Sequence, residues 1–319
     1  MFKPIPGAYP VMITPYNTDG TVDYGAVRAL TEWYHREGCA GIFASCQSSE
    51  IHALDLADRV KLAEVTKATA VELAKDGSRP AMSVVASGHI SDSFADQREE
   101  LSAVAATGVD AVIFISNRFD IPNTSDEAWI ADMLRMTEAI PDVPLGIYEC
   151  PRPYKRLLTP AMIDALTKTG RYAFIKDTCC NASEIHRRIA QISAIECGGM
   201  KPALFNANGQ TMLETLRDGG AGYCGVMANF HPALWAWLCN NWDKDPELAE
   251  LVAAALSQAA FIEHRTYPAI AKYHLNNIGV KMTTISRTCD VSQMGEYDIL
   301  CVEKMNRLIA HFEKLTGVR

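Results

Sequence analysis

The sequence predicts a (β/α)8 barrel that is followed by a small all-helical C-terminal region. Short apolar runs rich in Val, Ile and Phe alternate with longer segments of helical period, and this alternation is typical of parallel strands covered by helices. Eight such runs occur, and a chain of 319 residues is long enough for a closed barrel. An open, doubly wound sheet is the alternative, because alternation alone does not fix the order of the strands.

The candidate strands are separated by amphipathic segments with credible helix caps. The predicted strands span residues 11–14, 41–45, 82–86, 111–115, 145–148, 173–176, 203–206 and 223–226. The predicted caps are Ser125 ahead of Asp126-Glu127, Thr159 ahead of Pro160, and Asn181 with Glu184 three residues on.

The strand pattern does not recur after the eighth run. Residues 231–242 predict the last barrel helix, and the polar segment Asp243-Lys244-Asp245-Pro246 predicts a break. Residues 247–273 and 297–315 have helical periods. We therefore expect a barrel over residues 1–242 and a C-terminal helical region over residues 243–319.

The composition excludes several classes of partner. The net charge is -8 and no Lys/Arg cluster is present, so we expect no nucleic-acid binding. The first residues lack the features of a secretory signal, and no apolar run approaches the roughly 20 residues of a membrane span. The ten cysteines show no CxxC pattern, which favours reduced thiols and a cytoplasmic protein.

Lys176 and Tyr148 each stand at the C-terminal end of a predicted strand. Side chains at these ends of a barrel project into the catalytic mouth. Partial desolvation there favours the neutral amine, which can attack a ketone to form an imine. A protonated imine lets an adjacent C–C bond break or form, or a β-hydroxyl leave, while a nearby phenol transfers protons. The alternative is that Lys176 is a solvated strand tip and Tyr148 a core aromatic residue.

Several segments of the chain resemble those of one known family. They are residues 7–16 near the N-terminus, Tyr148-Glu149-Cys150-Pro151, Phe174-Ile175-Lys176-Asp177, the glycine-rich residues 219–222, and Val280-Lys281. Together they resemble the dihydrodipicolinate synthase / N-acetylneuraminate lyase family of Schiff-base-forming aldolases, over nearly the whole chain.

The resemblance implies a role for each matching residue. Lys176 would form the imine with pyruvate or a related 2-keto acid, Tyr148 would transfer protons, and no further cofactor would be needed. The family's Gly-Thr-Thr-Gly-Glu segment, which holds the keto acid's carboxylate, corresponds here to residues 46–50. Ser48 keeps a hydroxyl and is expected to act with Lys176 and Tyr148, whereas Gln47 and Ser49 are expected to contact the substrate. Both glycines are replaced, so the geometry of this loop is open.

Other positions depart from the synthases of this family. A Tyr-Tyr pair is replaced by Arg118-Phe119, and Phe119 has no hydroxyl with which to continue a proton relay. An arginine that binds the second substrate is replaced by Pro153. True dihydrodipicolinate synthase activity is therefore not expected. Arg118 and Arg152 are candidate anchors for another acidic or hydroxylated group, or else solvated loop residues, and Phe119 and Cys224 are further candidate substrate contacts.

The predicted function is a cofactor-free lyase that acts on a 2-keto acid. As an aldolase its second substrate would be an aldehyde, and as a dehydratase it would take a 2-keto-3-deoxy sugar acid. One rival is a catalytically silent member that binds a small keto acid as a sensor, which the altered 46–50 loop suggests. A metal-dependent aldolase is a second rival, although the eight histidines form no HxH or HExxH motif. The resemblance also implies a homo-oligomer, commonly a tetramer.

Overall fold

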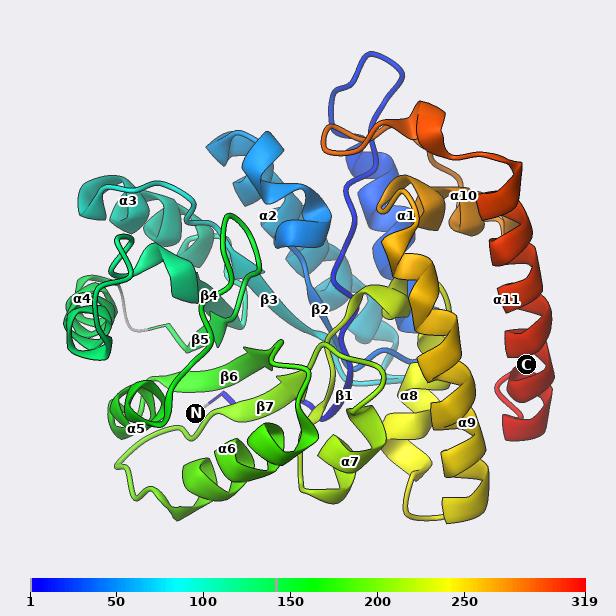
Figure 1. Cartoon of the computed structure of the whole chain (residues 1–319). Coiled ribbons are helices and arrows are strands. Elements are labelled where there is room, and N and C mark those ends of the chain that lie inside the picture. The colour runs from blue at the N-terminus through cyan, green and yellow to red at the C-terminus, as the bar shows by residue number, and fades with distance from the viewer. Residues whose placement is uncertain (1, 141–142) are drawn as a thin grey trace.

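The computed structural model describes residues 2–140 and 143–319. Its centre is a barrel of parallel strands surrounded by helices (Figure 1). The strands lie in the order β1-β8-β7-β6-β5-β4-β3-β2. They are β1 Gly7–Ala8, β2 Gly41–Phe43, β3 Ser83–Ser87, β4 Ala111–Ile115, β5 Leu145–Tyr148, β6 Tyr172–Asp177, β7 Ala203–Asn206 and β8 Gly222–Tyr223.

The barrel closes through the first strand and the segment that follows it. Gly7 of β1 pairs with Gly222 of β8. The Phe43 N–H of β2 donates to the Pro10 carbonyl at 2.9 Å, and Val11 forms a single parallel bridge with Phe43. The (β/α)8 barrel is thus confirmed, and the open doubly wound sheet is excluded.

The predicted bounds of the first strand are wrong. The strand is Gly7–Ala8 and not residues 11–14. Gly7 and Gly222 have φ values of 142° and 153°, and a Cβ on Gly222 would lie 1.9 Å from the Gly7 carbonyl oxygen. β1 and β8 therefore approach too closely for a side chain between them. For this reason the sequence has no apolar run where these two strands pair. β8 likewise begins before the predicted residue 223 and ends at Tyr223.

The helices begin largely where the caps predict. The side chains of Ser125, Thr159 and Asn181 each accept a hydrogen bond from a backbone N–H of the first helical turn. The helices are α1 Tyr24–Arg36, α2 Leu56–Leu73, α3 Phe94–Ala105, α4 Asp126–Ala139, α5 Pro160–Lys168, α6 Ala182–Ala194, α7 Met212–Arg217, α8 Pro232–Asn241, α9 Pro246–Ala259, α10 Ala269–Asn277 and α11 Glu296–Thr316.

The single helix predicted for residues 247–273 is wrong. The chain forms α9, a short 3₁₀ helix at Ala260–His264, and then α10 after Pro268. Proline cannot continue a helix through the position it occupies here, because its ring blocks the preceding turn. The predicted boundary at residue 242 falls between α8 and α9. Residues 1, 141 and 142 of the predicted barrel range lie outside the described residues.

Two apolar clusters hold the fold together. The larger one lies between the strands and the surrounding helices. The smaller one fills the barrel interior, where the rings of Phe174 and Phe205 stack at 4.4 Å and Tyr9 lies 4.6 Å from Phe205. Tyr148 belongs to this inner cluster. The side chains of the inner cluster are therefore packed against one another inside the barrel, near the ends of β5 and β6.

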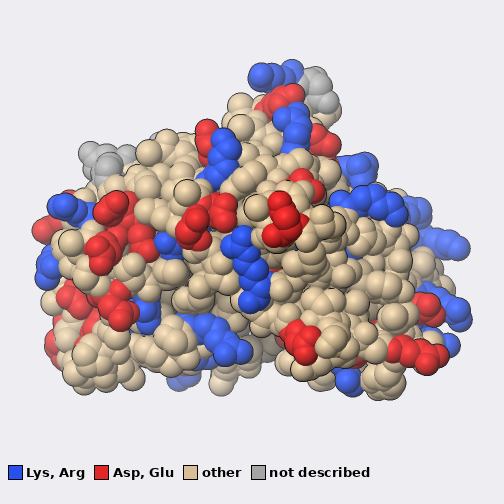
Figure 2. All heavy atoms as spheres, turned by 90° about the horizontal axis from the view of Figure 1, so that it is seen from above, with Lys and Arg blue, Asp and Glu red and all other residues tan. Residues whose placement is uncertain are grey.

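The C-terminal helices pack on one side of the barrel, where α9 and α11 contact α8 (Figure 1). Basic and acidic side chains are interspersed on the face shown in Figure 2, and neither sign covers it alone. Within residues 2–140 and 143–319, no helix has the length and apolar character needed to cross a membrane.

Candidate active site

Lys176 and Tyr148 face one another across neighbouring strands. They are register partners in the β5–β6 pair. The Lys176 Nζ lies 4.1 Å from the centre of the Tyr148 ring and 5.3 Å from the centre of the Phe43 ring. Both residues are 4% exposed. The amine is therefore held against aromatic faces inside the barrel, and it is not a solvated strand tip.

Both residues line a cavity of about 980 Å³. Gln47, Ser48 and Arg152 also line it, so the structure brings these three predicted residues to the same place. The volume is at the upper end of what small-molecule sites use. A three-carbon keto acid therefore leaves room for a second, larger group.

Tyr148 lies in a buried pocket with the Cys150 and Cys46 thiols beside it. Burial raises the pKa of its phenol well above the ordinary value, and the neighbouring Cys150 and Cys46 thiols raise it further. Burial also raises the pKa of Cys150, and the Cys150 thiol donates to the Gln47 Oε1 at 3.5 Å. At neutral pH the phenol keeps its proton, so it can both donate and accept.

The loop that replaces the family's two glycines keeps a compact turn. Cys46 has an extended backbone with φ of -155°, and Ser49 lies in the short 3₁₀ helix Gln47–Ser49. Neither position needs a positive φ, so the absence of the glycines does not strain the loop. Ser49 does not line the cavity. Its hydroxyl donates to the carbonyls of Met12 and Ala44, at 2.6 and 3.1 Å. These hydrogen bonds hold the turn in place.

Glu50 is the residue of this loop with a left-handed backbone, at φ of 62°. Its Oε2 accepts hydrogen bonds from the Ser286 hydroxyl, the Arg287 N–H and the Thr288 hydroxyl at 2.6 to 2.9 Å. Its Oε1 lies 3.5 Å from the Nζ of the buried Lys272. The C-terminal region thus anchors the loop that carries Gln47 and Ser48.

Three other predicted substrate contacts do not line the cavity. Arg118 is buried beside the barrel, where its Nη1 donates to the Ile90 carbonyl and to Asp92. Phe119 packs against Phe114, Trp129 and His89 in the larger apolar cluster between strands and helices, called the outer cluster below. Cys224 is fully buried in the inner cluster. The 3₁₀ helix Ser116–Arg118 redirects the chain after β4, which is why the Arg118-Phe119 pair points away from the cavity.

One wall of the cavity comes from the C-terminal region and was not predicted from the sequence. Glu263, His264 and Tyr267 line it. The Tyr267 oxygen accepts a hydrogen bond from the Asn229 Nδ2 at 3.1 Å and interacts with the Ser48 hydroxyl. The Tyr267 and Ser48 hydroxyls therefore lie together at the edge of the cavity. Pro268, inside the predicted long helix, was the one sequence signal of a break here.

Glu263 gives this wall a carboxyl group. Burial raises the pKa of Glu263, and the nearby charges of His264 and Lys176 oppose that rise. No hydrogen bond or ion pair to another described residue occupies this carboxyl group. Within the described ranges, no three His, Cys, Asp or Glu side chains gather in a way that could hold a metal ion.

Known proteins resemble this chain in sequence and in fold. A 4-hydroxy-tetrahydrodipicolinate synthase of Clostridium perfringens (strain SM101 / Type A) is 26% identical over 286 residues, which cover 87% of this chain and 89% of that protein. The sialic acid aldolase of Ruminococcus gnavus is similar in fold, with a TM-score of 0.82 and 17% identity over 98% of this chain and all of that chain (100%). The dihydrodipicolinate synthase from Acinetobacter baumannii complexed with pyruvate has a TM-score of 0.80 and 20% identity, covering 95% of this chain and 98% of that chain.

The model of the dihydrodipicolinate synthetase family matches residues 4–293. This match covers most of the 319 residues and confirms the resemblance seen in the motifs around Tyr148 and Lys176. The chain belongs to the dihydrodipicolinate synthetase family and is an enzyme of its class I aldolase/lyase type.

Proposed function

We propose that this enzyme forms a Schiff base between the Lys176 amine and pyruvate or a related 2-keto acid, and that it needs no metal or organic cofactor. One observation carries the proposal. Lys176 is 4% exposed, its Nζ lies 4.1 Å from the Tyr148 ring, and its side chain lines a cavity of about 980 Å³. An amine held in this way beside a phenol suits imine chemistry.

The proposed reaction begins with attack of the neutral Lys176 amine on the ketone carbon. Tyr148 gives a proton to the developing hydroxyl, which leaves as water when the imine forms. In the cleavage direction, the deprotonated Tyr148 takes the proton of the hydroxyl that becomes the aldehyde oxygen, and the electrons of the broken C–C bond flow into the protonated imine. The aldehyde leaves, and Tyr148 returns the proton to the enamine. In dehydration, removal of a proton next to the imine gives an enamine that expels a β-hydroxyl group as water. Hydrolysis then returns the free amine.

The carboxylate of the keto acid is proposed to bind between the 46–50 loop and the C-terminal wall. The Gln47 Oε1 accepts from the Cys150 thiol, which leaves the amide N–H₂ as a donor. The Ser48 and Tyr267 hydroxyls bond to one another, so together they leave one further O–H donor for the carboxylate. Ser49 supports this site indirectly, because its hydroxyl holds the turn.

The second substrate is proposed to differ from that of a true dihydrodipicolinate synthase, although curated relatives carry that name. Pro153 stands where those synthases have an arginine, and Phe119 lies in the outer cluster. Arg152 and Glu263 line the remaining space, which suits an aldehyde or a 2-keto-3-deoxy sugar acid with several polar groups. We also propose a homo-oligomer, a tetramer by family resemblance, that acts in the cytoplasm, where its ten free cysteines stay reduced.

The sensor hypothesis is not supported by the geometry of the loop. It was suggested by the missing glycines at positions 46 and 49, but neither position has a positive φ. Gln47 and Ser48 reach the cavity. The geometry therefore favours turnover over simple binding.

Borohydride trapping tests the proposal. Wild-type protein treated with pyruvate and borohydride should gain the mass of one reduced pyruvate adduct, and peptide mapping should place it on Lys176. Lys176→Ala should gain none. Lys155→Ala is the matched control, because Lys155 lines the same cavity but is exposed, and it should be labelled like the wild type. An adduct on Lys176→Ala, or no adduct with any 2-keto acid tried, would overturn the proposal.

A further inference from the structure

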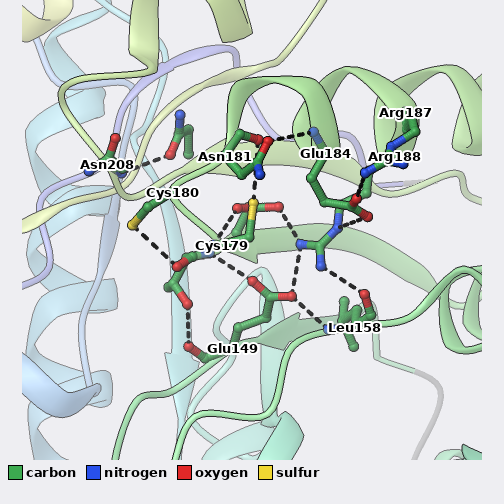
Figure 3. Close-up of polar contacts among 12 residues, drawn as sticks. Glu149, Leu158, Cys179, Cys180, Asn181, Glu184, Arg187, Arg188 and Asn208 are labelled. Carbon is green, nitrogen blue, oxygen red and sulfur yellow. Dashed lines mark hydrogen bonds and ion pairs between the residues drawn. The ribbon is translucent and has the colours of Figure 1, made fainter.

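The residues that follow Tyr148 and Lys176 in sequence form a buried charged cluster on the other side of the barrel wall. Because side chains alternate along a strand, Glu149 and Asp177 point away from the cavity. Both side chains are fully buried, and both meet Arg188 of α6, which is 2% exposed. Figure 3 shows the contact between Glu149 and Arg188. One guanidinium group therefore joins the ends of the two strands that carry the proposed catalytic pair.

Arg188 donates to three acceptors at this point. Its Nη1 donates to the Glu149 Oε1 at 2.8 Å and also to Asp177. Its Nη2 donates to the Leu158 carbonyl at 2.7 Å, in the segment before α5 (Figure 3). Arginine is suited to such a junction, because its planar fork offers several donors in fixed directions.

The two carboxylates also hold the backbone. Glu149 accepts hydrogen bonds from the Leu158 N–H at 2.7 Å and the Thr178 N–H at 2.8 Å. Asp177 accepts from the Cys179 N–H at 2.8 Å. The cluster thus fixes the chain immediately after Tyr148 and immediately after Lys176, and both oxygens of each carboxylate are in use.

A cluster of this kind is a poor source of stability for its own sake. Replacing a buried ion pair with apolar groups is often neutral or stabilising, because desolvation offsets the attraction between the charges. Here two carboxylates share one guanidinium, and burial together with the charge of Asp177 raises the pKa of Glu149 to about 7. What the cluster does provide is a set of directional bonds that define one geometry.

We propose that Arg188 is a positioning residue that, through Glu149 and Asp177, sets the Tyr148 phenol against the Lys176 amine. The inference rests on the proposed function of Lys176. The phenol has little tolerance for displacement, since a shift of about 1 Å can cost about 100-fold in rate. Arg188 itself touches neither the cavity nor the reacting atoms.

The test compares Arg188→Lys with Arg187→Lys. Both change one arginine of α6 to lysine, but Arg187 is exposed and pairs with Glu184 at the surface. Arg188→Lys keeps the positive charge and loses the planar guanidinium group with its several N–H donors. In the folded protein its kcat should fall about 10- to 100-fold, while borohydride trapping at saturating pyruvate is retained and KM for the keto acid changes little. Arg187→Lys should match the wild type.

A merely structural role gives a different result. Arg188→Lys would then lower the melting temperature, but the folded fraction would keep the wild-type kcat, and that outcome overturns the inference. If wild-type protein shows no trapping, the proposed function fails, and the comparison of kcat values is not reached. The two failures are therefore distinguishable.

Glu149→Gln serves as a second variant in case Arg188→Lys does not fold. It keeps the shape of Glu149 and removes its titration. The groups that face Glu149 are Asp177, Arg188, the Thr178 and Leu158 N–H groups, and Cys180. Wild-type kcat should decline as the pH falls below about 7, because a protonated Glu149 cannot accept all of its hydrogen bonds, whereas Glu149→Gln should be slow and lack this decline. An unchanged pH profile in folded Glu149→Gln would contradict the inference.

Discussion

Replacing Tyr148 with phenylalanine isolates the proton-transfer step from the rest of the site. The substitution removes one oxygen and leaves the ring that lies 4.1 Å from the Lys176 Nζ. That oxygen interacts with the Cys150 thiol, which in the variant still has the Gln47 Oε1 as acceptor at 3.5 Å. Thiols are weak hydrogen-bonding partners, so the free energy of unfolding should fall by no more than about 1 kcal/mol.

The effect on turnover should be much larger. A positioned acid or base contributes about 100- to 10,000-fold, which corresponds to about 3 to 5 kcal/mol in the activation free energy. The assay measures kcat with the preferred 2-keto acid substrate and, in parallel, the yield of borohydride-trapped pyruvate at long incubation. Tyr148→Phe should lose most of kcat and keep its trapped yield.

Tyr9→Phe is the matched control for this experiment. Tyr9 is also fully buried, lies in the inner cluster, and uses its hydroxyl to donate to the Ile5 carbonyl at 3.0 Å. Removal of this hydroxyl should cost stability but leave kcat at the wild-type level. If Tyr148→Phe keeps the wild-type kcat, the phenol takes no part in the reaction, and the assignment of Tyr148 is refuted.

Two further predictions concern stability. His231→Phe should stabilise the protein by about 1 kcal/mol at pH 7, because neither ring nitrogen has a hydrogen-bond partner among the described residues. Burial lowers the pKa of His231 from 6.5 to about 3, so the unfolded state binds the proton first as the pH falls. The free energy of unfolding of the wild type should therefore drop below pH 6.5. Urea titrations from about pH 7 to 5 should show a less steep drop for His231→Phe. Lys272→Met should cost about 3 to 5 kcal/mol by leaving Glu50 without its counter-charge and should raise KM for the keto acid. Adding Glu50→Gln should recover part of that stability, and full stability in Lys272→Met alone would contradict the argument.

The sequence contained enough local information to predict most of the barrel. The bounds of β4, β5 and β7 match the predicted runs, because strands buried on both faces are continuous apolar segments. The prediction of the first strand failed for a physical reason. The defining feature of this strand is the close approach of Gly7 to Gly222, which joins distant parts of the chain and leaves no periodic pattern.

The same distinction applies to the residues in and around the candidate site. Lys176 and Tyr148 were predictable because each lies at the end of its own strand, and the ends of neighbouring parallel strands meet at one edge. The role proposed for Arg188 was not predictable, because it is one of several arginines in the sequence. Its contacts with Glu149 and Asp177 become evident only in the folded chain. Phe119 was assigned to the site by analogy, and a short 3₁₀ helix after β4 places it in the outer cluster.

The C-terminal region also has a larger part in the site than its pattern suggests. The segment around residue 287 binds the Glu50 carboxylate through three groups, and Lys272 of α10 adds the counter-charge. Tyr267 contacts the same loop through Ser48. These contacts anchor the loop that carries Gln47 and Ser48 at the cavity. An enzyme built in this way can change its substrate by changing its C-terminal wall, while the strand ends that carry Lys176 and Tyr148 stay fixed by Arg188.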